Sequence, residues 1–294
     1  MVPNKRMSKS LTRCPEFAAI AAMLLGSIMP CRGQTARAHS EPATARVDHL
    51  FAQWDRPDTP GCSVAVSREA ELLYQHGYGT ASIELAVPIS PTTVFHAASV
   101  SKIFTAQAIM ILAQQGKVSL DDEVQRYLPG FPDYAQKLTI RNLLSHTGGL
   151  RDVFELQALA APAPGSRDPN DQFVNLLAHQ SKLNFEPDSE WQYSNGGYLV
   201  LASIVKRVSG MSLRDFAEAN IFRPLGMKDT RFHYDPTEII PNRASGYSPG
   251  DNGPRAALNA DPGGIVGNAG LFTTAPSSSL NSYSSSSTGS PTML

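Results

Sequence analysis

The sequence predicts an α/β fold, and three observations support this. Two strand-like apolar runs, 62–66 and 71–75, are separated by a polar turn and indicate a β-hairpin. A long apolar segment begins at Ser99 and several helix-like segments follow it, so the middle of the chain is predominantly α and strands bracket it. With 294 residues, 41% hydrophobic and 17% charged, the chain has an ordinary globular composition and can bury a sizeable core.

The helices follow from the apolar periodicity. A first helix is predicted over 41–54, where apolar residues recur at helical spacing and prolines follow. The segment 99–115 is apolar on nearly every face and ends at Gly116, which predicts a helix buried between other elements. Further helices are predicted at 119–128, 139–145, 171–181, 196–209 and 212–221.

The two ends of the chain differ from the rest. Basic residues precede the apolar run 17–29, and the small-x-small pattern Ala36-Arg37-Ala38 follows it. This predicts a signal peptide over residues 1–38 and a secreted or periplasmic protein. The run is shorter than the roughly 18 residues of a membrane span, so no stable membrane anchor is expected. Residues 277–290 are mostly serine, which predicts a disordered tail over 276–294 after a hydrolase domain at 39–275.

Charge and cysteine content exclude some functions. Loss of residues 1–38 would change the formal charge from -1 to about -6. A net negative charge does not indicate the positively charged surface that binding to nucleic acid requires. Cys62 would then be the one remaining cysteine, so no internal disulfide could form. It lies in a strand-like run, where a buried apolar role is favoured over a reactive thiol.

The pattern Ser99-Val100-Ser101-Lys102 is the first candidate for chemistry. In a helix this spacing sets the lysine one turn after the serine, on the same face. A serine hydroxyl needs a base to become a nucleophile, and a lysine serves once burial and nearby positive charge lower its pKa. A helix start adds unpaired N–H groups that favour a developing oxyanion.

The same four-residue pattern occurs again at Ser203-Ile204-Val205-Lys206, so the pattern alone is weak. Ser203 falls inside the predicted helix 196–209, where neighbouring N–H groups are already used. We therefore interpret Ser203 as structural and Ser99 as the nucleophile.

Tyr193-Ser194-Asn195 is the second candidate, in a predicted loop before the 196–209 helix. A tyrosine beside a protonated lysine has a lowered pKa and can pass a proton to a leaving group. Asn195 can donate to a substrate carbonyl and hold the lysine. The alternative is that both residues only form a turn before a helix.

Together these motifs resemble the serine β-lactamases and penicillin-binding proteins, in particular the class C β-lactamase and esterase branch. The resemblance runs from about Pro60 to Ala275. It also includes the segment 143–150 and the pair Gly263-Gly264 followed by 270–274. It implies a mixed sheet flanked by helices plus an all-helical region, with the site in the cleft between them. It also implies Ser99, Lys102 and Tyr193 as catalytic residues and Asn195 as a substrate-binding residue.

One departure from the family pattern affects the expected activity. The family's third motif, Lys/His/Trp-x-Gly on a later strand, does not follow the Gly-Gly landmark, which leads us to expect that the last sheet strands are missing. His146-Thr147-Gly148 matches its letters but precedes Tyr193, and we expect it to shape a loop between helices. The missing strand would carry one oxyanion donor, whose loss costs roughly 10² to 10³ in rate.

Two functional hypotheses follow. The first is a serine hydrolase that forms an acyl-enzyme with a small-molecule or peptide-like substrate, such as a β-lactam, an ester or a peptide. The second is a truncated, non-catalytic remnant of the same family that binds ligand at most. The sequence has no H-E-x-x-H, paired cysteines or acidic cluster at ligand spacing, so neither a metal nor another cofactor is expected. Partner nucleic acids are not expected either.

Overall fold

The computed structural model describes residues 42–69, 71–135, 137–159, 169–235, 237–257 and 264–280. The predicted signal peptide and most of the predicted serine-rich tail lie outside these ranges. Within them the protein has a mixed α/β fold, as predicted, but its strands form four small sheets. In these same ranges we find no helix with the length and apolar character needed to cross a membrane.

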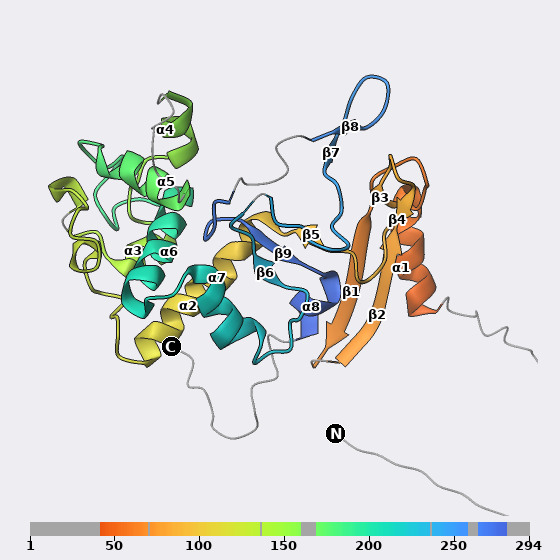
Figure 1. Cartoon of the computed structure of the whole chain (residues 1–294), viewed down its shortest axis with the longest axis horizontal. Helices are drawn as coiled ribbons and strands as arrows, with labels where there is room; N and C mark the ends of the chain where they lie inside the picture. The colour runs from red at the N-terminus through yellow and green to blue at the C-terminus, as the bar shows by residue number, and fades with distance from the viewer. Residues whose placement is uncertain are drawn as a thin grey trace, which may run out of the picture. The chain divides into compact units, whose positions relative to one another are not determined.

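Helices and strands are distributed along the whole described chain (Figure 1). The α-helices are α1 (Ala43–Phe51), α2 (Ser101–Gln114), α3 (Ile140–Ser145), α4 (Val153–Leu159), α5 (Pro169–Ala178), α6 (Asn195–Ser209), α7 (Leu213–Ala217) and α8 (Ala275–Leu280). The shorter helical turns are η1 (Ala52–Trp54), η2 (Ala98–Val100), η3 (Val124–Arg126), η4 (Asp133–Ala135) and the π-helical η5 (Glu218–Phe222). The strands are β1 (Cys62–Arg68), β2 (Glu71–Tyr78), β3 (Thr80–Ser82), β4 (Val87–Pro88), β5 (Phe95–His96), β6 (Arg231–Phe232), β7 (Tyr247–Ser248), β8 (Arg255–Ala256) and β9 (Leu271–Thr273).

The strand pairs are antiparallel. β1 and β2 form the predicted hairpin, with Cys62 opposite Tyr78 and an irregularity after Val66. β9 is the central strand of a three-stranded sheet, between β5 and β6. Because β5 leads directly into η2, this sheet fixes the backbone that precedes Ser99.

The hairpin lies between two helices (Figure 1). From α1, the Asp48 carboxylate accepts hydrogen bonds from the hydroxyls of Tyr74 and Tyr78, the latter at 2.8 Å. On the other side, α8 packs against β1 and β2. This helix occupies the first part of the segment predicted to be a disordered tail. Thr274 Oγ1 accepts from Ser277 N–H at 3.3 Å, which supports the helix start despite the serine-rich sequence.

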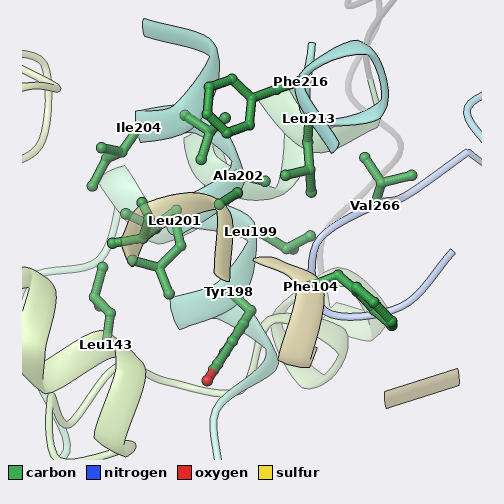
Figure 2. Close-up of a cluster of buried hydrophobic side chains, with 14 of the residues drawn as sticks. Phe104, Leu143, Tyr198, Leu199, Leu201, Ala202, Ile204, Leu213, Phe216 and Val266 are labelled. Atoms are coloured by element: carbon green, nitrogen blue, oxygen red, sulfur yellow. The ribbon is translucent and has the colours of Figure 1, made fainter. Parts of the chain in front are cut away.

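The hydrophobic core is centred on α6 (Figure 2). Leu199, Leu201 and Ile204 have no exposed surface, and α6 packs against α2, α3, α5 and α7. A Cβ at Gly196 would lie 2.9 Å from the Leu177 side chain, so the glycine permits the close approach of α5. This packing holds the first turns of α2 and α6 in fixed positions.

Two helix predictions are wrong in part. The prediction that α2 is buried all round fails on the face that carries Ile103 and Met110, whose exposed fractions are 64% and 44%. Of the helix predicted at 119–128, only η3 forms. The backbone there pairs with residues 138–141 instead: Val124 N–H donates to Leu138 O at 2.9 Å, and Arg141 N–H donates to Leu120 O at 2.8 Å. Tertiary pairing thus overrides the local helical pattern.

Candidate active site

Ser99 lies in η2, between strand β5 and helix α2. Ser99 is exposed to solvent, whereas the helix that follows, α2, is largely buried. The preceding residue, Ala98, has φ of 44°, which a non-glycine residue adopts only when the surroundings impose it. The Ser101 hydroxyl donates to Ala98 O at 2.6 Å and holds this turn in place. The backbone therefore presents Ser99 at the start of α2.

Lys102 lies in the first turn of α2 and is only 7% exposed. Its ammonium nitrogen has three acceptors: Ser99 Oγ at 3.3 Å, Asn195 Oδ1 at 2.9 Å and the Asn268 carbonyl oxygen at 2.8 Å. A protonated lysine has three N–H donors, so every donor has a partner. The nitrogen also lies 4.7 Å from the centre of the Tyr193 ring.

Tyr193 and Asn195 reach the same place from the start of α6. The Tyr193 hydroxyl donates to Ser99 Oγ at 2.8 Å, and Asn195 is the first residue of the helix. Ser194 between them is the N-cap, with its hydroxyl oxygen accepting from Gly197 N–H at 3.1 Å. The structure thus brings together all four residues that the sequence predicted for the site.

The electrostatics of the site favour a mobile proton. Burial lowers the pKa of Lys102, and the interaction with Tyr193 opposes this only in part. Burial raises the pKa of the Tyr193 phenol, but the interactions with Lys102 and Ser99 outweigh it, so the net pKa lies below its ordinary value. The N-termini of α2 and α6 both meet here, and their positive dipole ends favour negative charge on an oxygen.

The segment 264–270, just before β9, is a part of the site that the sequence did not reveal. Its Asn268 carbonyl contacts Lys102, and its Gly267 carbonyl accepts from the buried Thr105 hydroxyl of α2 at 2.8 Å. Ser101 Oγ accepts from Leu271 N–H at 3.0 Å. Gly267 has φ of 113°, and the Gly-rich sequence was the one signal available.

The second S-x-x-K pattern, at 203–206, and Cys62 are not part of the group around Ser99. Ser203 donates to Leu199 O at 3.1 Å within α6, and Lys206 is exposed and 3.8 Å from Asp171. This agrees with a structural role for Ser203. Cys62 is a partly buried residue of β1, and burial raises the pKa of its thiol. That environment keeps the thiol protonated at neutral pH.

His146-Thr147-Gly148 forms the turn after α3, as expected, but it also borders the site. His146 is the left-handed C-cap of α3, and its ring lies 4.7 Å from the Tyr193 ring, centre to centre. Among the described residues, no group of three or more His, Cys, Asp or Glu side chains is arranged to hold a metal ion.

Comparison with known proteins gives a consistent result. Residues 47–277 match the model of the family described as Beta-lactamase. Penicillin-binding protein 4* of Bacillus subtilis (strain 168) is 36% identical over 196 residues, which cover 64% of this chain and 41% of that protein. The D-aminopeptidase of Brucella anthropi is 32% identical over 199 residues, which cover 66% of this chain and 38% of that protein.

The fold has relatives among solved structures. The octameric penicillin-binding protein homologue from Pyrococcus abyssi superposes with a TM-score of 0.67 at 25% identity, over 79% of this chain and 53% of that one. The chain spans 41% and 38% of the length of the two curated relatives it matches.

Proposed function

Because the chain belongs to the Beta-lactamase family of serine hydrolases, we propose that it cleaves small amide, ester or β-lactam substrates through an acyl-enzyme on Ser99. The observation that carries this proposal is the convergence of two proton-carrying groups on one oxygen. Lys102 Nζ lies 3.3 Å and the Tyr193 hydroxyl 2.8 Å from Ser99 Oγ. Both distances suit proton transfer once substrate tightens the site.

Lys102 is the proposed base in the first step. A neutral lysine keeps two N–H donors, which Asn195 Oδ1 and the Asn268 carbonyl can hold, so its lone pair faces Ser99. The Ser99 proton then moves to Lys102 while Oγ bonds to the substrate carbonyl carbon. The proposed donor for the resulting oxyanion is the backbone N–H of Ser99, in the turn η2 that leads into α2.

Tyr193 is the proposed carrier of the proton to the leaving group. When the tetrahedral intermediate collapses, the bond from the carbonyl carbon to the leaving nitrogen or oxygen breaks, and that atom receives a proton through Tyr193. Water then attacks the ester on Ser99 and loses a proton to the same pair; the bond between Oγ and the carbonyl carbon breaks, Oγ takes up that proton, and the carboxylic acid is released. An amine is a poor leaving group until it is protonated, so this arrangement suits amides, and the D-aminopeptidase relative supports the same substrate class.

A covalent probe tests the proposal. A fluorophosphonate or a fluorescent penicillin should label the protein once, and peptide mapping should find the label on Ser99. Ser99→Ala should abolish labelling, while the matched variant Ser203→Ala should retain it. Labelling that persists in Ser99→Ala and disappears in Ser203→Ala would overturn the assignment.

Export is a separate proposal that rests on the basic, apolar and small-residue order of residues 1–38. Expression of the full chain in a bacterium with a periplasm should give a processed protein that begins near His39. N-terminal sequencing would contradict export if it found Met1 on a protein retained in the cell.

A further inference from the structure

His146 contacts the Tyr193 segment in three ways. Its Nδ1 accepts a hydrogen bond from Ser194 N–H at 3.1 Å, and its carbonyl oxygen accepts from Gln192 N–H at 3.0 Å. Its ring packs on the Tyr193 ring at 4.7 Å with an interplanar angle of 34°. These contacts fix the backbone on both sides of Tyr193 and the ring itself.

The position of His146 is imposed by the fold. As the C-cap of α3 it has φ of 62° and ψ of 30°, and its N–H donates to Asn142 O. Non-glycine residues are uncommon in this left-handed conformation, although Asn, Asp and His are enriched among those that adopt it. A loop that served only to connect two helices would not need an imidazole here, because Gly would close the same turn without a steric cost.

The bond from Ser194 also fixes the state of the imidazole. A backbone N–H can only donate, so Nδ1 must carry no proton and a neutral ring is protonated on Nε2. The titratable groups around the ring are Lys102 from α2, Tyr193, and Tyr198 from α6, whose ring centre is 5.3 Å away. The carboxylate of Asp188 accepts a hydrogen bond at 3.0 Å from the hydroxyl of Thr147, the residue that follows His146. Burial and the charge of Lys102 both lower the pKa of His146.

We propose that His146 is a positioning residue: its neutral imidazole holds Tyr193 so that the hydroxyl stays on Ser99 Oγ, and protonation of the ring releases it. This inference rests on the proposed function, because it assigns His146 an effect that passes through Tyr193. Protonation would place an N–H at Nδ1 against the N–H of Ser194, and the two donors repel. Acylation of Ser99 should therefore decline as His146 gains a proton at acid pH.

Two variants separate the acceptor from the ring. His146→Asn keeps an acceptor oxygen near the position of Nδ1 and tolerates the left-handed backbone, but it loses the ring. His146→Phe keeps the ring and loses the acceptor. We expect His146→Phe to lower the rate of labelling by a fluorescent penicillin, whose leaving atom is a ring nitrogen that needs the proton from Tyr193, by about 10- to 100-fold, since small misplacements of a reacting group cost this much. His146→Asn should restore most of the rate and remove the His146 contribution to the acid limb of the pH profile. His179→Phe, at an exposed turn residue directly after α5, should leave the rate unchanged.

A double-mutant cycle with Tyr193→Phe decides whether the effect passes through Tyr193. In that background His146→Phe should cause no further loss, and circular dichroism should show that every variant is folded. A native rate in folded His146→Phe, or an equal loss with and without the Tyr193 hydroxyl, would overturn the inference. Failure of the proposed function has another signature, since the native protein would then not be labelled on Ser99, or Tyr193→Phe alone would have no effect.

Discussion

Replacing Asn195 with aspartate tests whether Lys102 must lose its proton before Ser99 reacts. Asn195 Oδ1 lies 2.9 Å from Lys102 Nζ, and the lysine is 7% exposed. An aspartate would place a negative charge at this position with little change of shape. Opposite charges favour the protonated lysine, so the variant should raise the pKa of Lys102 and reduce its capacity to accept a proton.

The size of the effect follows from Coulomb's law. At a separation of 2.9 Å, a pair of unit charges gains about 1.4 kcal/mol in bulk water and about 6 kcal/mol at an effective dielectric constant of about 20. About 1.4 kcal/mol corresponds to a factor of ten in an equilibrium. The neutral fraction of Lys102 at neutral pH should therefore fall at least about tenfold, and the rate of acylation should fall with it.

The assay compares Asn195→Asp with Asn195→Ala. Both variants lack the amide group that can contact substrate; alanine also removes the acceptor of Lys102, and only aspartate adds a charge, so a lower rate in Asn195→Asp than in Asn195→Ala reports the stabilisation of the protonated lysine. Rates of labelling by a fluorophosphonate should differ by at least about tenfold at neutral pH, and the difference should diminish as alkaline pH deprotonates Lys102. Equal rates with superimposable pH profiles would refute the role of a neutral Lys102.

Three further predictions follow from the same geometry and packing. Lys102→Arg should lower acylation by about 10² to 10⁴, because a guanidinium does not lose its proton, and unchanged labelling of a folded variant would contradict the role of Lys102. Phe272→Ala should reduce the free energy of unfolding by about 3 to 5 kcal/mol in a denaturant titration, since its ring has no exposed surface; a loss under about 1 kcal/mol would contradict this packing. Alkylation of Cys62 should be slower at neutral pH than that of a free cysteine and should accelerate with rising pH; the rate of an unhindered thiol would disagree with the partly buried strand.

The parts predicted well from the sequence are those whose pattern is local. The hairpin alternates over adjacent segments, α6 has a strong helical period with Ser194 at its N-cap, and both are present. The two short motifs could be assigned to one site because together they resemble the serine β-lactamases and penicillin-binding proteins. Ser203 could be separated from Ser99 by its place within a predicted helix.

The parts that were missed depend on contacts between distant residues. Lys102 donates to the backbone carbonyl of Asn268, and every residue type has this group, so the identity of residue 268 does not predict the contact. The positive φ of Ala98 and the position of His146 beside Tyr193 result from tertiary packing, not from local propensity. The exposed face of α2 was unexpected because apolar residues occur all around the helix, and periodicity alone does not indicate which of them are covered.

The acceptors of Lys102 come from distant parts of the chain, and this affects when the site forms during folding. Asn195 and Asn268 are 93 and 166 positions away from Lys102 along the sequence. Contacts of such long range must wait for loop closure, while helices form within microseconds. A ribosome-bound chain that ends before Asn268 thus has both motifs yet lacks one of the groups that orient the lysine. Reactivity of Ser99 should accordingly appear after most helical signal in refolding, and it can serve as a marker of the fully assembled chain.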